Sequence, residues 1–117
     1  MPVPPQLDLE RLTELEGLLG ADRAAIVGTL MTELTVQMTR IDQAVESGDL
    51  EQVAGAAHSA RNSALMIDAR PVLVVLRRLE SCARDGEAEG AAAACLQLRE
   101  EWPRLRRELE RAGDAGG

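Results

Sequence analysis

Apolar residues recur along most of this chain at intervals of three and four, which is the period of an amphipathic α-helix. Residues that cap or end helices separate five such stretches, at about residues 8–18, 22–47, 49–67, 68–85 and 88–112. No stretch shows the strict alternation of apolar and polar residues that is typical of a β-strand. The pattern therefore predicts an all-α protein.

Two prolines affect the predicted helices, one at the start of the fourth helix and one inside the last. We expect Asp68 to cap the fourth helix, with Pro71 in its first turn, where a missing N–H does no harm. Pro103 interrupts the last helix, but the apolar spacing resumes with Leu105 and Leu109. We therefore expect Pro103 to bend this helix and not to end it.

Short connections between long amphipathic helices favour an antiparallel four-helix bundle, here with a short extra N-terminal helix. A chain of 117 residues corresponds to one domain. The predicted bundle spans residues 7–112, between a disordered, proline-containing lead-in at 1–6 and a disordered tail at 113–117. Its core must be aliphatic, because the chain has one Trp and neither Phe nor Tyr.

Composition excludes several classes of function. The formal net charge of −7 argues against a nucleic-acid partner and against an anionic membrane surface. No apolar run approaches the roughly 20 residues that a membrane span needs, and no signal peptide is visible, so we expect a cytoplasmic protein. We also expect it to be a monomer. Cys82 and Cys95 match no zinc-site spacing and fit small, reduced core residues, so no metal site is predicted.

The third predicted helix carries the only histidine of the chain, His58. One face of this helix is apolar and predicted to be buried; it contains Leu50, Val53, Ala57, Ala60, Ala64 and Ile67. His58 lies on a second face, with Glu51, Ala54, Gly55, Arg61, Asn62 and Leu65. The two faces point well apart, so His58 should be presented at the surface of the bundle.

An exposed histidine offers an unprotonated imidazole nitrogen as a nucleophile near neutral pH. Attack on an acyl or aspartyl phosphate would give an energy-rich phosphohistidine. Arg61, one turn after His58, would supply positive charge in fork geometry to the phosphoryl oxygens. If the next helix returns antiparallel, Arg77 and Arg78 lie level with His58, and we expect one of them to flank the phosphoryl group.

The sequence His58-Ser-Ala-Arg61, followed by Ala69 and then Leu79-Glu80, resembles the histidine phosphotransfer (HPt) domain of two-component phosphorelays. That family carries His-x-x-Lys/Arg-Gly, then Gly-Ala ten residues after the histidine, then Leu-Glu in the next helix. The resemblance covers residues 7–112. It implies that His58 accepts a phosphoryl group from a receiver aspartate or a kinase and passes it to another receiver, with Arg61 stabilising the group. It also implies that Mg²⁺ comes from the receiver and that no cofactor is held here.

The resemblance further implies a supporting and partner-docking surface around His58. We expect this surface to contain Ala54, Gly55, Asn62, Leu65, Arg77, Arg78, Glu80 and Arg84. Among these, Glu80 and Arg84 align with family positions that contact the histidine or the partner.

The chain departs from the family pattern at Asn62 and Asp68, where the family has glycine. Asn62 favours an alternative function, a non-catalytic adaptor that docks a receiver or kinase without being phosphorylated. A purely structural bundle, or a tail excised from a hybrid kinase, is a third possibility. No glycine-rich phosphate loop is present, so we expect no ATP binding, no self-phosphorylation and no independent enzymatic turnover.

Overall fold

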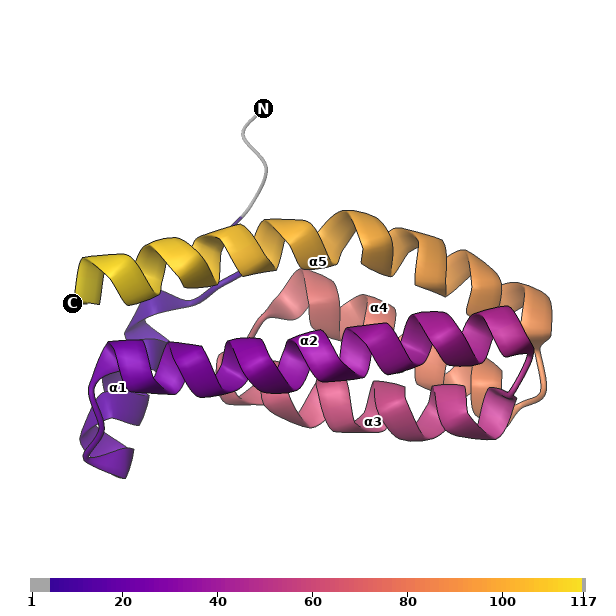
Figure 1. Ribbon diagram of the computed structural model, residues 1–117, viewed down its shortest axis with the longest axis horizontal. Helices are drawn as coiled ribbons and strands as arrows, with labels where there is room; N and C mark the ends of the chain where they lie inside the picture. The colour runs from indigo at the N-terminus through magenta and orange to yellow at the C-terminus, as the bar shows by residue number, and fades with distance from the viewer. Residues whose placement is uncertain (1–4, 117) are drawn as a thin grey trace.

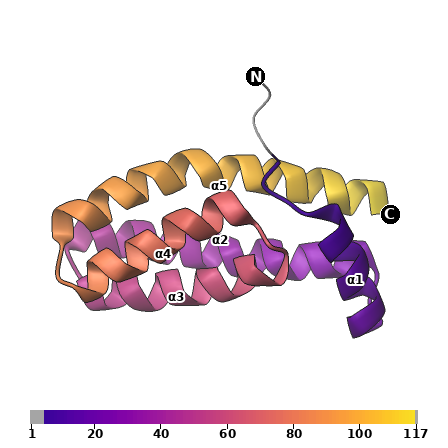
Figure 2. The ribbon, with the colours of Figure 1, turned by 180° about the vertical axis from the view of Figure 1, so that it is seen from behind.

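The computed structural model describes residues 5–116, and within that range the regular structure consists of helices alone. The five helices are α1 (Leu9–Leu19), α2 (Arg23–Ser47), α3 (Leu50–Met66), α4 (Arg70–Arg84) and α5 (Ala88–Gly116). Helices α2 to α5 run up and down beside one another, and α1 lies across the end where α5 finishes (Figures 1 and 2). The predicted all-α bundle with a short extra N-terminal helix is thus confirmed.

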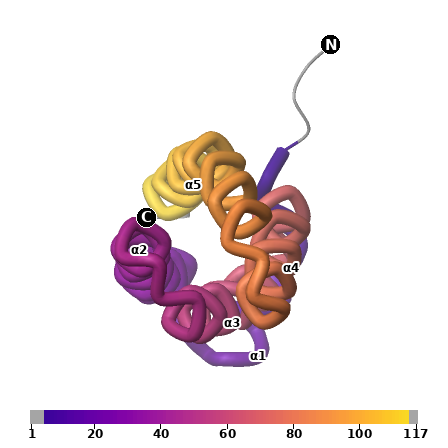
Figure 3. The backbone as a smooth tube through the Cα atoms, turned by 90° about the vertical axis from the view of Figure 1, so that its right-hand side faces the viewer, coloured from indigo at the N-terminus to yellow at the C-terminus, as the bar shows by residue number. Residues whose placement is uncertain are grey.

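Each helix of the bundle packs against its neighbours in the chain. Helix α3 contacts α2 and α4, and α5 closes the ring by contacting α4 and α2. The view along the bundle shows this order directly (Figure 3). Short connections therefore join adjacent antiparallel helices, and α3 packs directly against α4. None of the described helices is long and apolar enough to cross a membrane.

The core is aliphatic, as the composition requires. Large side chains from every helix are almost fully buried, among them Leu12, Leu34, Ile41, Leu76, Leu79, Leu105 and Leu109. On α3 the core face is built mostly from alanines, and Ala57, Ala60 and Ala64 have no exposed surface. Small side chains let the neighbouring helices approach α3 closely, so the predicted buried face of this helix is confirmed.

The two cysteines are free thiols that belong to the packing between helices. Cys95 is buried, and burial together with a hydrogen bond to Asp42 raises its pKa to about 11. Cys82 is half-buried against Gly90 of α5, where an added Cβ would lie only 2.8 Å from its sulfur. Both positions agree with their predicted packing role.

The turn between α3 and α4 differs from the prediction. Ala69, and not Asp68, is the N-cap of α4, and no side chain caps this helix. Asp68 adopts a left-handed conformation with φ 49°, and its N–H donates to the Leu65 carbonyl. Asp68 therefore follows the C-cap Ile67 as a left-handed residue, a conformation that glycine adopts most easily and that closes many helices. Aspartate is among the residues that tolerate this conformation best.

The described structure extends past both ends of the predicted bundle, residues 7–112. Helix α5 continues to Gly116, because Ala112 is still buried and Gly113 lies against Val27 of α2. Residue 117 and residues 1–4 lie outside the described range. Gln6 is only 2% exposed, so the expected lead-in does not extend over it. We call residues 5–8 the N-terminal strap.

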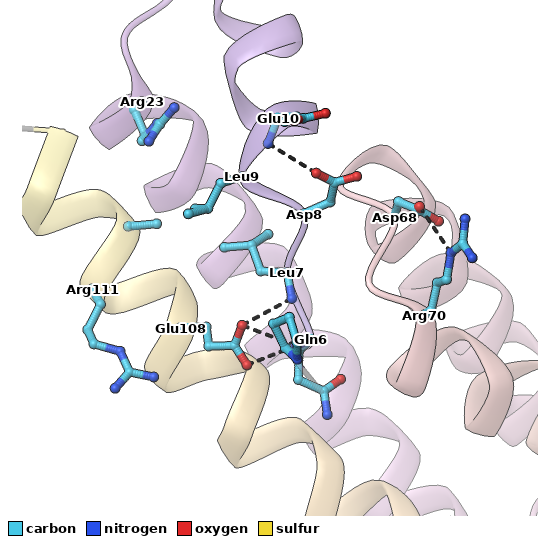
Figure 4. A pocket seen from close by; sticks show the side chains of 12 residues that line it. Gln6, Leu7, Asp8, Leu9, Glu10, Arg23, Asp68, Arg70, Glu108 and Arg111 are labelled. Atoms are coloured by element: carbon cyan, nitrogen blue, oxygen red, sulfur yellow. Dashed lines mark hydrogen bonds and ion pairs between the residues drawn. The ribbon is translucent and has the colours of Figure 1, made fainter. Parts of the chain in front are cut away.

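A glutamate of α5 holds the strap. The Glu108 carboxylate accepts hydrogen bonds from the backbone N–H groups of Gln6 and Leu7, at 2.9 and 3.1 Å (Figure 4). The Gln6 side chain also donates to Glu101, one residue before Trp102. Pro103 lies inside α5, which curves over the bundle and continues (Figure 2). The prediction that Pro103 does not end α5 is confirmed, since Leu105 and Leu109 keep the following turns buried.

Candidate functional site

His58 lies near the middle of α3, on the side that faces away from the core. Its side chain is 45% exposed, as the two-face pattern predicted. Gly55 and Asn62, about one turn before and after it, are exposed as well. An added Cβ at Gly55 would meet no neighbouring atom within 4 Å. The imidazole therefore lies on an exposed face of α3 with Gly55 and Asn62, and a macromolecular partner can approach it there. We call this face the His58 ridge.

A single carboxylate from α4 lies beside this ring. The Oε2 atom of Glu80 is 3.2 Å from Nδ1 of His58. The Glu80 side chain is only 9% exposed, because it leaves α4 next to the buried Leu79 and is covered where α4 packs on α3. A buried carboxylate needs charged or hydrogen-bonding partners to offset its desolvation.

Two arginines supply those partners. Arg84, one turn further along α4, donates from Nε and Nη2 to Glu80 Oε2 at 3.0 and 2.8 Å. Arg61 of α3 places Nε 3.4 Å from Glu80 Oε1 and Nη2 3.0 Å from His58 Nδ1. The buried Oε1 of Glu80 and Nε of Arg61 form this ion pair without a hydrogen bond of good geometry. The site is thus a carboxylate held between two guanidinium groups and an imidazole.

The charge state of Glu80 follows from these contacts. Burial raises the pKa of Glu80, but the Arg84 hydrogen bonds, the charge of Arg61 and the His58 contact together outweigh it. The pKa of Glu80 is therefore lower than its ordinary value of 4.5. At neutral pH this carboxylate is ionised and acts only as a hydrogen-bond acceptor.

The two neighbours of Nδ1 select opposite tautomers of the imidazole. If Nδ1 carries the proton, it donates to Glu80 and leaves Nε2 with a free lone pair. If Nε2 carries the proton, Nδ1 accepts from Arg61. Only the first tautomer presents a nucleophilic nitrogen on the side away from Glu80.

The other residues expected on this surface occupy different environments. Ala54 is largely buried, and together with Gly55 and Arg84 it lines an open hollow of about 580 Å³ between α3 and α4, one turn from His58. Leu65 and Asn62 are exposed, and no hydrogen bond joins the Asn62 amide to His58 within residues 5–116.

Within the described residues Arg77 and Arg78 make no contact with His58 through a hydrogen bond or ion pair, and the expectation that one of them flanks the phosphoryl group stays a prediction. Both are exposed. Counting residues from the turn places them level with His58 but ignores the direction of the side chain around α4. The residue that points to His58 is Glu80, which only the family resemblance had indicated. A possible signal in the residues was that Glu80 is the one acid among the four arginines of α4.

A separate cavity lies at the end of the bundle where α1 and α5 meet (Figure 4). It measures about 700 Å³ and lies between the strap, the start of α4 and the C-terminal part of α5. His58 and Glu80 do not line it. The exposed ridge around His58 fits a protein partner better than a small ligand, because ligand sites are usually concave.

Two comparisons with known proteins, one of sequence and one of structure, each found a match. A sequence model described as the Hpt domain matches residues 25–112. The fold is similar to the crystal structure of histidine-containing phosphotransfer protein B from Pseudomonas aeruginosa PAO1. The TM-score is 0.87, the sequence identity 21%, and the match covers 97% of this chain and 98% of that one. No curated protein sequence matches the chain significantly.

Proposed function

Because this chain belongs to the Hpt domain family, we propose that it is a phosphorelay intermediate whose phosphoacceptor is His58. It would accept a phosphoryl group from a receiver-domain aspartate or a kinase and pass it to another receiver. The observation that carries this proposal is the contact between the exposed His58 ring and the buried, ionised Glu80. That contact favours the tautomer in which Nε2 is the nucleophile.

The transfer step follows from this arrangement. Nε2 of His58 attacks the phosphorus of an aspartyl phosphate, and a nitrogen–phosphorus bond forms while the phosphorus–oxygen bond to the aspartate breaks. The electron pair of that bond stays with the departing carboxylate. The ring keeps its proton on Nδ1 and becomes positively charged, and the negative Glu80 next to it stabilises that charge. The reverse sequence delivers the group to the next receiver.

The arginines have separate roles in this proposal. Arg61 is released from Nδ1 when the reactive tautomer forms, and its guanidinium can then bind the phosphoryl oxygens. Arg84 positions Glu80 through two hydrogen bonds. The Mg²⁺ that commonly assists phosphoryl transfer would be bound by the receiver. The free thiols of Cys82 and Cys95 suit the reducing cytoplasm, where we place the chain.

The test is incubation with a panel of purified receiver domains that carry a radioactive phosphoryl group. We expect acid-labile label on the wild-type chain and none on His58→Gln, with the melting temperature unchanged because the ring is outside the core. Label that persists on His58→Gln would exclude His58 as the acceptor. Absence of label on the wild-type chain with every receiver would exclude the relay function.

The adaptor is the second candidate, and the exposed Asn62 favours it. Its side chain stands one helical turn after His58, where glycine would leave more room for a receiver. The adaptor function predicts measurable binding to a phosphorylated receiver without transfer of label. Titration calorimetry on the same receiver panel therefore separates the two functions.

A further inference from the structure

Helix α4 differs from the rest of the molecule in charge. It contains Arg70, Arg77, Arg78 and Arg84 against the single acid Glu80, so its formal charge is +3 in a chain of −7. None of the other described helices has a net positive charge. Because Glu80 is buried, the exposed surface of α4 is more basic than this count suggests.

Two of these arginines have no acidic partner. Arg70 pairs with Asp68, and Arg84 pairs with Glu80. Arg77 and Arg78 are exposed and make no ion pair within residues 5–116, although acids outnumber arginines in the chain by 20 to 13.

Arg77 and Arg78 are adjacent in sequence but lie on different sides of α4. At about 100° per residue, Arg77 lies about 60° around the helix from Glu80, whereas Arg78 lies about 160° away. Glu80 faces α3 and His58. Arg78 lies one helical turn before Cys82, on the same side of α4, and Cys82 packs against Gly90 of α5. Arg77 therefore flanks the His58 ridge, about one turn along α4 from Glu80, and Arg78 borders the α5 side.

We propose that Arg77 is a partner-selecting contact, which binds an acidic group on the surface of the receiver that docks over His58. The proposal rests on the phosphorelay function proposed above. A receiver with acidic groups around its donor aspartate would be repelled at long range by a chain with a formal charge of −7. An unpaired cation beside the reactive histidine offsets that repulsion locally and fixes the orientation of docking. Arg77 acts on encounter and does not touch the reacting atoms.

The experiment compares three charge reversals: Arg77→Glu, Arg78→Glu as the neighbour on the other side of α4, and Arg107→Glu on α5. Arg107 is exposed and has no ion pair in the described residues, so it controls for net charge. With a receiver that labels the wild-type chain, we expect Arg77→Glu to raise the KM for the receiver about tenfold. The rate at saturating receiver should stay unchanged, and the defect should fade in about 0.5 M salt, where the Debye length is only a few ångströms. Both controls should change KM less than threefold.

Several results would overturn the proposal. Equal effects of Arg77→Glu and Arg78→Glu would show a general charge effect, and a lower rate at saturating receiver would show that Arg77 takes part in the transfer step. If no receiver labels the wild-type chain, the relay function fails, and the same variants are compared by calorimetric binding to a receiver. Weaker binding of Arg77→Glu alone would then support the docking role, and equal binding of all variants would refute it.

Discussion

Two glutamates on neighbouring helices are bound by different kinds of group. Glu80 of α4 is bound by the side chains of His58, Arg61 and Arg84. Glu108 of α5 is bound by backbone N–H groups of the N-terminal strap. Both carboxylates satisfy donors that would otherwise lack a partner, but only Glu80 is connected to an exposed nucleophile. The partners of a carboxylate, more than its burial, therefore distinguish a site for chemistry from a contact that completes the fold.

The largest predicted effect tests whether Glu80 and Glu108 have separate roles. Glu80→Gln removes the charge that stabilises the imidazolium, and we expect transfer to His58 to fall by about 10²–10³-fold. Glu108→Gln removes an equal charge from the strap and should leave the transfer rate unchanged. Single-turnover transfer from a phosphorylated receiver measures both. A Glu108→Gln variant as slow as Glu80→Gln would show that the two glutamates do not have separate roles.

Arg61→Ala sharpens the comparison, because Arg61 touches both Glu80 and His58. A hydrogen bond to a charged group is worth about 1.5–3 kcal/mol, which is roughly 10- to 100-fold in rate. We expect transfer to slow by that factor, and the free energy of unfolding to fall by about 1–3 kcal/mol because the buried Glu80 loses one of its two guanidinium partners. Arg106→Ala, which breaks an exposed ion pair with Glu110 on α5, is the matched control. Transfer by Arg61→Ala at the wild-type rate would make Arg61 an ordinary solvated charge.

Acid should weaken the contribution of Glu80 to stability. The pKa of Glu80 is lowered in the folded state, so the unfolded chain binds more protons between the two values and stability rises with pH there. The contribution of Glu80 is complete above its ordinary pKa of 4.5 and is lost as the pH falls through the lower folded-state value. The difference in unfolding free energy between the wild type and Glu80→Gln should therefore shrink below about pH 4. Urea titrations from pH 7 to pH 3 measure it, and a difference that grows in acid would contradict the assignment.

The fold could be predicted because the 3.6-residue period and the capping residues depend on local sequence alone. The site could be predicted only in part. The exposure of His58 follows from the two faces of α3, but the approach of Glu80 depends on how α4 is rotated against α3, which counting residues does not reveal. The same limit applies to the order of the strap, since Gln6 is held by Glu108, a residue 102 positions away. Asp68 lies in the turn after α3 and does not cap α4, and the sequence does not decide between these positions because aspartate suits both an N-cap and a left-handed turn.

The smallest predicted effect concerns Asn62, one turn after His58. Its side chain is exposed and forms no hydrogen bond to His58 in the described structure, so the amide does not fix the ring tautomer. Helical side chains lean toward the preceding turn, and Asn62 therefore occupies space beside His58 that a receiver must enter. We expect Asn62→Gly to transfer roughly two- to fivefold faster, which corresponds to less than about 1 kcal/mol.

The same change should lower the free energy of unfolding by roughly 0.5–1 kcal/mol, because glycine in a helix interior costs conformational entropy. Gln43→Gly, at an exposed position of α2, should have a similar stability cost and leave the rate unchanged. Single-turnover transfer assays and thermal melts on both variants separate three outcomes. Asn62→Gly can transfer more slowly than the wild type, fail to transfer, or transfer faster. A slower Asn62→Gly would mean that the amide binds the phosphoryl group, and lost stability without any transfer in either the variant or the wild type would support the adaptor. A faster variant would show that the Asn62 side chain hinders the approach of the receiver while the Glu80–His58 pair remains competent.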